Sequence, residues 1–253
     1  MVWSHCCLCV ALLWPLSAQA LKLRLCVDSR PHPPFLTPDG GGNVGLLVKL
    51  AAAESGIELE LYSAPVTRCR AEIAAGLADG YPSASYTPSL LPLLHYPMKD
   101  GRPDAARSVL LVRVMAFRRV GGQVEWDGAR FAQLKTPVLV GYGSVMMIDR
   151  LTAMGQGIDA ESRSLDATFA KLMAGRGDVA LGWEVDGRAL LAKPGFAGKV
   201  EALAPPFAEE LYYLGLSKRF YQSEGDAAER LWNAIGRIKQ SAPYLAAIKP
   251  VQP

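Results

Sequence analysis

A short pattern that occurs twice is the strongest constraint on how this chain folds. The stretches "AAGLADG" (74–80) and "MAGRGDV" (173–179) both consist of a helix end, a glycine, a spacer, an aspartate and the start of a strand. Each closes a segment in which strand-like and helix-like hydrophobic patterns alternate. That order requires parallel strands joined by helical crossovers, so the sequence predicts two similar α/β units with a cleft at their boundary.

The patterns also place the individual elements. We expect strands at 21–27, 57–64 and 136–141, and helices at 44–56, 67–76, 145–154, 164–175 and 225–240. Gly56 and Gly76 are predicted to end their helices, and Thr67 and Ser164 to cap the starts of theirs. Two long extended runs, 107–120 and 210–218, follow one after each unit. We interpret these two runs as the two crossings of a hinge.

The first predicted strand runs directly into the loop "DSRPHPPF" (28–35). Proline fixes φ near −65°, cannot donate to a sheet, and pushes the residue before it into an extended conformation. The loop is therefore expected to be rigid and to place Phe35 at a defined position, as a buried aromatic beside a turn or as part of a binding site.

The first twenty residues contain no Lys, Arg, Asp or Glu, and they lead through an apolar run to "AQA". This pattern predicts a signal peptide cleaved after Ala20 and export to the periplasm without membrane insertion of the mature chain. Two cysteines then remain, Cys26 and Cys69. In an oxidising compartment they are either a disulfide that closes a loop of about 43 residues or two buried thiols.

The composition excludes several classes of function. The net charge of +3 is spread along the chain, which predicts neither nucleic-acid nor membrane-surface binding. Only His32 and His95 follow the predicted cleavage point, and the chain contains no nucleophile-elbow, P-loop or zinc-protease motif. We therefore expect no metal, no cofactor and no histidine-based catalysis, and a mature protein that is a monomer.

The ordered set of these stretches resembles the family 3 extracellular solute-binding proteins, the periplasmic receptors of polar amino-acid ABC transporters. The stretches that carry the resemblance are "LRLCVDSRPHPPF", "GGGNVGLLVKLAAAESG", "AEIAAGLADG", "VLVGYGSVMMIDRL", "SLDATFAKLMAGRGDVAL" and "LYYLGLSKRF". The resemblance implies an α/β, two-lobed fold of periplasmic-binding-protein type II, with mixed sheets in each lobe and a two-strand hinge. It implies lobe 1 at 21–111 plus 214–253, and lobe 2 at 112–213.

The resemblance also implies a set of ligand-binding positions. Phe35 matches the aromatic wall of the site, and the turn "GYGS" before the helix at 145 offers N–H groups to a negative charge. A cation is expected from Arg68, with Arg70 and Arg30 as alternatives, unless these arginines are solvated surface charges. The predicted ligand-binding residues are Phe35, Arg68, Ser85, Tyr86, Thr87, Gly143, Ser144, Trp183 and Glu184.

Two positions depart from the pattern of the amino-acid receptors. Leu90 stands in "YTPSLLPLL" where such receptors have the arginine that clamps the ligand carboxylate, and Trp183 stands where they have the carboxylate that binds its ammonium. The sequence thus predicts a non-catalytic binding protein for a ligand other than an ordinary α-amino acid, presented to an ABC permease or a membrane sensor. The alternatives are a cyclohexadienyl-type dehydratase that uses Glu184, and an interaction module without a ligand.

Overall fold

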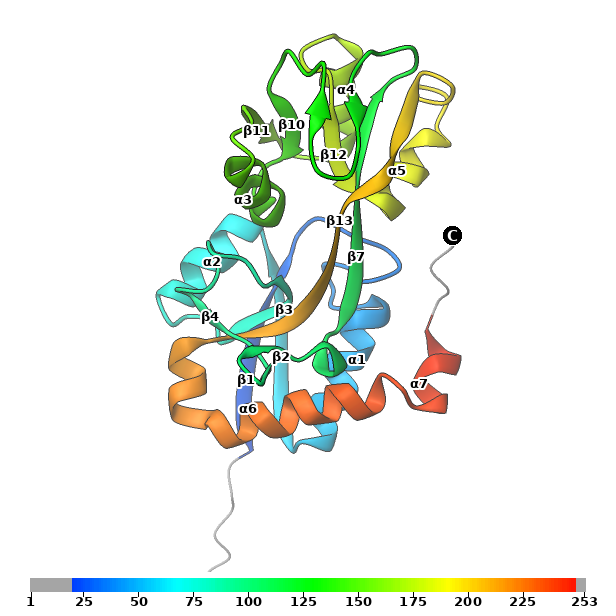
Figure 1. Ribbon diagram of the computed structural model, residues 1–253. Helices are drawn as coiled ribbons and strands as arrows, with labels where there is room; N and C mark the ends of the chain where they lie inside the picture. Colours follow the sequence, from blue (N-terminus) through cyan, green and yellow to red (C-terminus); the bar gives the residue numbers. More distant parts are fainter. Residues whose placement is uncertain (1–19, 249–253) are drawn as a thin grey trace, which may run out of the picture.

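The computed structural model describes residues 20–248, and the predicted signal peptide lies outside this part except for Ala20. Two bodies lie one above the other, joined by two long strands (Figure 1). The lower body, lobe one, holds strands β1 to β4 and helices α1, α2, α6 and α7; the upper body, lobe two, holds β10 to β12 and α3 to α5. No helix in the described part is long and apolar enough to cross a membrane.

Lobe one is built on the parallel strands predicted from the alternating pattern. Strand β1 (Leu21–Asp28) pairs with β2 (Ile57–Ala64) in register from Leu21↔Ile57 to Asp28↔Ala64, and with β3 (Gly80–Ser85) on its other side. The apolar side chains of helix α1 (Gly42–Glu54) and of helix α6 (Lys218–Ile238) pack against this sheet. The remaining elements of this lobe are α2 (Val66–Ala74), β4 (Leu94–His95), β5 (Met98–Lys99), β6 (Arg102–Pro103), the 3₁₀ turn η1 (Ala105–Arg107) and α7 (Ala242–Ala247).

Lobe two repeats the arrangement. Strand β10 (Val138–Gly141) lies in parallel pairing between β11 (Ile158–Ser162) and β12 (Ala180–Trp183). The helices of this lobe are α3 (Val145–Ala153), α4 (Leu165–Met173) and α5 (Glu184–Leu191), and a small hairpin is formed by β8 (Glu125–Trp126) and β9 (Phe131–Ala132). The predicted two-unit α/β architecture is confirmed.

The repeated motif has the same structural role in both lobes. Gly76 and Gly175 end helices α2 and α4 with φ of +72° and +71°, the left-handed region that glycine adopts at least cost. The aspartates that follow them accept backbone N–H groups from the neighbouring segment, Asp79 from Arg24 at 2.8 Å and Asp178 from Lys135 at 3.1 Å. The repeated motif therefore marks two equivalent helix-to-strand turns.

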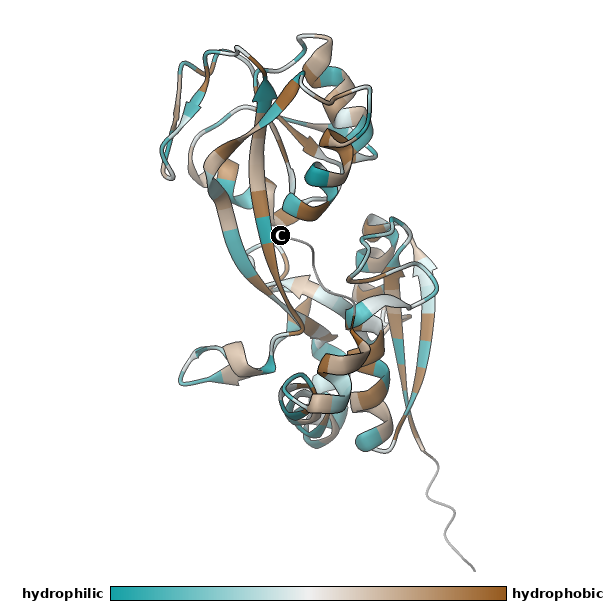
Figure 2. Cartoon of the chain, turned by 90° about the vertical axis from the view of Figure 1, so that its right-hand side faces the viewer, coloured by the Kyte–Doolittle hydropathy of each residue, from teal (hydrophilic) through white to brown (hydrophobic). Residues whose placement is uncertain are grey.

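Two strands pass from one lobe to the other, β7 (Leu110–Arg119) and β13 (Val200–Ser217). They pair antiparallel along their length, and their register breaks between Leu203 and Ala208, where Pro205 and Pro206 have no N–H to donate. β13 then pairs with β3, and β7 pairs with β12, so the sheets of the two lobes form one continuous nine-stranded sheet. Figure 2 shows these strands as the narrow connection between the lobes.

Cys26 and Cys69 form the predicted disulfide, with both residues fully buried. The bond joins β1 to α2 across a sequence separation of 43 residues. Closing a loop of this length removes chain entropy from the unfolded state worth about 4 kcal/mol. The disulfide therefore fixes helix α2, and the side chains it carries, against the central strand of lobe one.

One local prediction needs correction. The cap of α2 is Pro65, not Thr67, which lies inside the first turn. Glu184, one of the predicted binding residues, is the first residue of α5, with Trp183 as the cap. The other predicted cap is confirmed, because the Ser164 hydroxyl accepts the Ala167 N–H at 3.1 Å.

Candidate functional site

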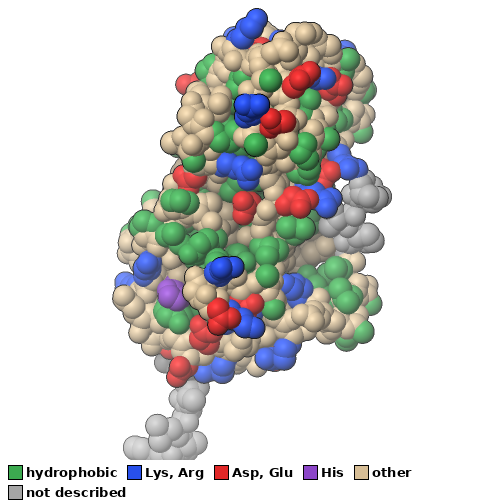
Figure 3. Space-filling model, in the orientation of Figure 1, with side chains coloured by type: hydrophobic (Ala, Val, Ile, Leu, Met, Phe, Trp, Pro, Cys, Tyr) green, Lys and Arg blue, Asp and Glu red, His purple; other side chains and the backbone are tan. Residues whose placement is uncertain are grey.

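A cavity of about 440 Å³ lies between the lobes. Its size is within the range of about 300–1,000 Å³ that is usual for small-molecule sites, and most of its wall is apolar. In Figure 3 hydrophobic side chains gather on lobe one just below the boundary between the lobes, with charged groups beside them. Lobe one contributes the ends of β1 and β3 and the start of α2; lobe two contributes the turn before α3, the end of β12 and one side of α5.

The proline-rich loop after β1 forms one wall of the cavity. Asp28 at the strand end accepts the backbone N–H of Arg30 and two of its guanidinium N–H groups, at 3.1, 3.0 and 2.7 Å. The loop then folds back on itself through a backbone bridge between His32 and Leu36. This turn brings the Phe35 ring edge-on to Trp183 of lobe two, with 6.3 Å between ring centroids.

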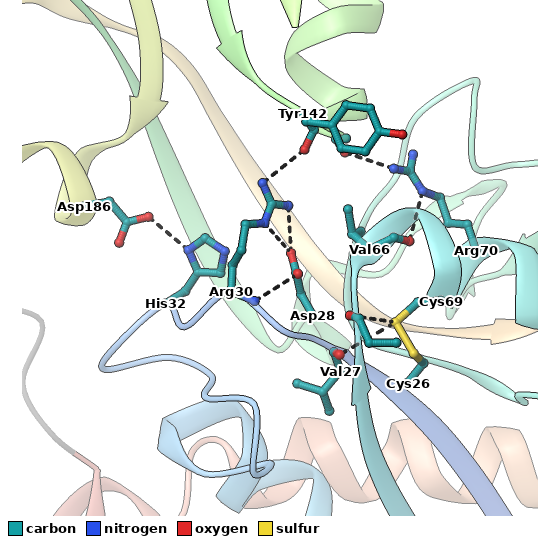
Figure 4. A network of polar contacts seen from close by, with 12 residues as sticks. Cys26, Val27, Asp28, Arg30, His32, Val66, Cys69, Arg70, Tyr142 and Asp186 are labelled. Atoms are coloured by element: carbon teal, nitrogen blue, oxygen red, sulfur yellow. Dashed lines mark hydrogen bonds and ion pairs between the residues drawn. A yellow bond between two sulfur atoms is a disulfide. The ribbon is translucent and has the colours of Figure 1, made fainter. Parts of the chain in front are cut away.

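Two arginines of lobe one reach across the cleft to the turn before α3. Arg30 donates from Nη1 to the Tyr142 carbonyl at 3.1 Å, and Arg70 donates from Nη2 to the Gly143 carbonyl at 3.2 Å (Figure 4). The two guanidinium groups therefore contact adjacent carbonyls of lobe two. Both contacts close the cleft.

A histidine closes the opposite side of the cleft. His32 Nδ1 lies 2.9 Å from Asp186 Oδ2 on α5, and the imidazole packs on Trp183 with 4.4 Å between ring centroids. Farther out, Ser89 donates its N–H to the Asp149 carboxylate of α3 at 3.1 Å. The structure is thus in a closed form, with polar contacts between the lobes on several sides of the cavity.

The arginine at the start of α2 differs from the other charged groups of the cavity. Arg70 donates to carbonyls only, to Val66 O at 3.4 Å and to Gly143 O, and no carboxylate of the described residues pairs with it. Its side chain is half-buried, and this loss of hydration lowers the pKa of the guanidinium below its ordinary value. It remains a cation at any physiological pH.

Hydroxyl groups line the inner wall of the cavity, on β3 and β13. Ser83, Ser85 and Tyr212 are 7%, 4% and 8% exposed, and Tyr81 is half-buried beside them. Burial raises the pKa of both tyrosines far above the ordinary value, so they remain neutral hydrogen-bond donors. The Ser83 and Tyr81 hydroxyls make no hydrogen bond to another described residue, which leaves both free toward the cavity.

The structure brings five of the nine predicted binding residues to the cavity wall. These are Phe35, Ser85, Gly143, Ser144 and Trp183. It does not bring the other four there, namely Arg68, Tyr86, Thr87 and Glu184.

Each of these four residues has other contacts or is turned away. Arg68 points to solvent and pairs with Glu72 at 2.7 Å, while Glu184 pairs with Arg188 at 2.7 Å. Tyr86 packs its ring against Tyr96. Thr87 is buried, and its hydroxyl has no hydrogen-bond partner among the described residues.

Other cavity residues were missed by the sequence prediction. Asp28 is the last residue of β1 and lines the cavity, at the carboxyl end of a parallel strand where binding sites commonly lie. Asp166 lies in α4, and Asp186 and Lys193 follow β12; the sequence pattern marked none of the three as a cavity residue. No group of three or more His, Cys, Asp or Glu within residues 20–248 is arranged to hold a metal ion.

Comparison with known proteins bears on the fold. No protein-family model and no curated protein matches this sequence. Solved structures do match over nearly their whole length, among them the three that follow. The GluR0 ligand-binding core from Nostoc punctiforme, in complex with L-glutamate, is 17% identical with a TM-score of 0.65, covering 88% of this chain and 96% of its own.

The second is a histidine kinase sensor domain with similarity to periplasmic binding proteins, 14% identical with a TM-score of 0.68, covering 90% of this chain and 94% of its own. The third is the amino-acid ABC transporter substrate-binding protein AbpA from Streptococcus pneumoniae, bound to L-arginine, 17% identical with a TM-score of 0.63, covering 90% and 92%. This chain has the two-lobed fold of the periplasmic binding proteins.

Proposed function

We propose that this protein is a non-catalytic receptor of the periplasm that closes its two lobes around a small molecule. The observation that carries the proposal is the cavity itself, which draws its wall from both lobes and is closed by polar contacts between them. The proposed lobes are 21–111 plus 214–253 and 112–213, joined at β7 and β13. A hinge of two strands permits the lobes to move as units.

The proposed ligand is not an ordinary α-amino acid. Leu90, at the position where the resemblance places a carboxylate-clamping arginine, is buried and apolar and lines the cavity. Trp183, at the position of the ammonium-binding carboxylate, lines the cavity with its ring and has no charge to offer. A zwitterion bound as in the amino-acid receptors would lose both of its ion pairs here.

The proposed partner is a membrane protein that recognises the closed form, either an ABC permease or a sensor. The similar structures include an ABC transporter substrate-binding protein and a histidine kinase sensor domain, so the fold serves both arrangements. The contacts between the lobes fix the angle between them. A partner that recognises this angle would therefore respond to these contacts.

The dehydratase alternative depends on Glu184, whose carboxylate pairs with Arg188 at 2.7 Å and lies 3.9 Å from Arg113, and which does not line the cavity. No other observation favours it. A prephenate turnover assay, with Glu184→Gln as the control, tests it directly, and turnover that disappears in the variant would reinstate the enzymatic interpretation.

A thermal-shift screen of the oxidised protein tests the receptor proposal. A ligand present at 100 times its Kd adds about 2.7 kcal/mol to the stability, which raises the melting temperature of a protein this size by roughly 5–10 °C. The panel should set amino acids against organic acids, amines and sugars. Small-angle scattering of the same samples then reports whether a stabilising compound changes the angle between the lobes.

A matched pair of variants locates the binding. Ala189 is exposed on α5 and lines the cavity, so Ala189→Trp fills the site without disturbing the core. Ala197 is exposed in the same lobe and does not line the cavity, so Ala197→Trp is its control. We expect ligand stabilisation to disappear in the first variant and to persist in the second. Stabilisation that persists in both, or an absence of any ligand across the panel, would contradict the proposal and favour an interaction module.

A further inference from the structure

The charged groups of the cavity wall are not all paired with one another. Three carboxylates line the cavity, and each has a partner. Asp28 forms an ion pair with Arg30 at 2.7 Å, and Asp166 lies 3.5 Å from the Lys193 ammonium. Asp186 is hydrogen-bonded to the His32 imidazole at 2.9 Å. Arg70 is the remaining cation of the wall, and no carboxylate in the described part of the chain accepts from it.

Arg70 is placed where a ligand can reach it. The disulfide at the adjacent Cys69 holds its helix against β1, and the guanidinium lies between the start of α2 and the turn at Gly143. Its two carbonyl acceptors supply hydrogen bonds without neutralising the charge. Its Nη1 has no hydrogen-bond partner in the part of the chain that the structure describes, so one edge of the guanidinium remains free for a carboxylate.

A second, independent observation points to a polar ligand at the same cavity. Ser83 is only 7% exposed, it lines the cavity, and its hydroxyl makes no hydrogen bond to another described residue. The Ser83 oxygen is not among the fully buried atoms that lack a partner, so it is reachable from the cavity, and a ligand oxygen can accept its hydrogen bond. Tyr81 lies close enough to Arg70 to influence the pKa of its guanidinium, and it also lines the cavity.

The rest of the wall selects the body of the ligand. Phe35 and Trp183 from opposite lobes, together with Leu90, Met147 and Leu181, offer an aromatic and aliphatic surface. An ammonium on the ligand would need a carboxylate, and each carboxylate of the wall already has a partner, Asp28 and Asp166 in an ion pair and Asp186 in its hydrogen bond to the His32 imidazole. A desolvated ammonium without a counter-ion is strongly unfavourable.

We infer that the ligand is a small organic acid with an apolar body and no amino group, whose carboxylate binds Arg70. This inference rests on the proposed receptor function and specifies the chemistry of its cavity. It places the anion-binding cation in the second turn of helix α2. It does not place it at position 90, after β3, where the amino-acid receptors have their arginine.

Compounds that differ by single groups test the inference. 3-Phenylpropanoate is phenylalanine without its ammonium, and 2-phenylethylamine is phenylalanine without its carboxylate; 4-methylpentanoate and leucine form a second pair. We expect the two acids to raise the melting temperature and quench Trp183 fluorescence, and the amino acids and the amine to bind at least tenfold more weakly. Equal or tighter binding of the amino acids or the amine would overturn the inference.

Variants of α2 supply the matched controls. Arg70→Gln should weaken binding of the acid by about 10- to 100-fold, the usual effect of losing a hydrogen bond to a charged group. Arg70→Lys keeps the charge and should recover part of the loss. Arg68→Gln, on the same helix but pointing to solvent, should change the affinity less than twofold. Unchanged binding in Arg70→Gln would overturn the assignment of the anchor.

The inference and the receptor proposal fail in different ways. If a compound of another class binds and Ala189→Trp abolishes its binding, the receptor function is supported and the assigned ligand chemistry is wrong. If neither these acids nor the wider panel stabilises the protein or changes its scattering, both fail. Binding of the acids that is lost in Arg70→Gln and in Ala189→Trp supports both.

Discussion

The turn before α3 provides a sharp test of how the lobes close. Gly143 has a φ of +79°, and a Cβ added there would lie 2.6 Å from Val66 Cγ1 and 3.0 Å from Arg70 Nη2. Both of these atoms belong to lobe one, whereas Gly143 belongs to lobe two. Gly143→Ala therefore adds a collision between the lobes to the ordinary cost of a left-handed alanine.

Gly155, at the other end of α3, separates these two effects. Its φ is +69°, and a Cβ there meets no atom within 4 Å. Gly155→Ala therefore carries only the conformational cost, roughly 1–2 kcal/mol, which lowers the melting temperature of a protein this size by roughly 2–8 °C. Gly143→Ala should show a similar loss of melting temperature, because the lobes can separate to relieve the collision.

The collision itself should appear in the closure equilibrium. Overpacking of a well-packed contact costs typically 1–3 kcal/mol, which shifts the ratio of closed to open molecules by roughly 5- to 150-fold. Small-angle scattering of the ligand-free variants should therefore give a larger radius of gyration for Gly143→Ala than for Gly155→Ala and the parent. Identical radii in both variants would refute the claim that this turn is pressed against α2.

Three further perturbations have defined outcomes. Cys69→Ala should cost about 4 kcal/mol of unfolding free energy, measured by urea denaturation against the oxidised parent, and a loss near zero would mean that the bond constrains little. His32→Phe keeps a ring on Trp183 but removes the hydrogen bond to Asp186. It should increase the radius of gyration without lowering the melting temperature by more than ~2 °C, and a radius equal to that of the parent would show that this hydrogen bond does not hold the cleft closed. The hydrogen bond from Lys171 lowers the pKa of Asp159 below its ordinary value, so the stabilisation that this carboxylate contributes is present at neutral pH and is lost as the pH falls through its folded pKa. Asp159→Asn should therefore lose less stability between about pH 5 and pH 2 than the parent. Parallel curves of stability against pH would contradict this.

Local chemistry made much of the fold predictable from the sequence. Ser164 is a helix cap because its hydroxyl can accept the N–H three residues on, and no distant contact is needed. Gly76 and Gly175 mark corners because they adopt a positive φ. The disulfide was one of the two states expected of Cys26 and Cys69 in an oxidising compartment, and parallel pairing followed from the order of strands and helices.

The binding site was less predictable, because it depends on which way each side chain points. Arg68 and Arg70 are separated by about 200° around a helix of 3.6 residues per turn, so only one of them can face the cleft. The sequence favoured Arg68, but the buried disulfide at Cys69 orients α2 so that Arg70 faces the cavity. Glu184 lies off the cavity wall for a similar reason, since β12 ends at Trp183 and helix α5 begins at Glu184.

The position of Arg70 links ligand binding to closure. In the closed structure its Nη2 donates to the Gly143 carbonyl of lobe two, beside the bond from Arg30 to the carbonyl of Tyr142. The cation proposed to hold the ligand therefore also joins the two lobes. A ligand can shift the closure equilibrium only by its differential affinity for the two forms. A carboxylate that binds the free edge of Arg70 adds to the existing contact and favours the closed form, whereas one that displaces the Gly143 carbonyl must first replace what that contact contributes. The change in the radius of gyration when the acid is added distinguishes these cases, because the radius falls in the first case and falls less or not at all in the second.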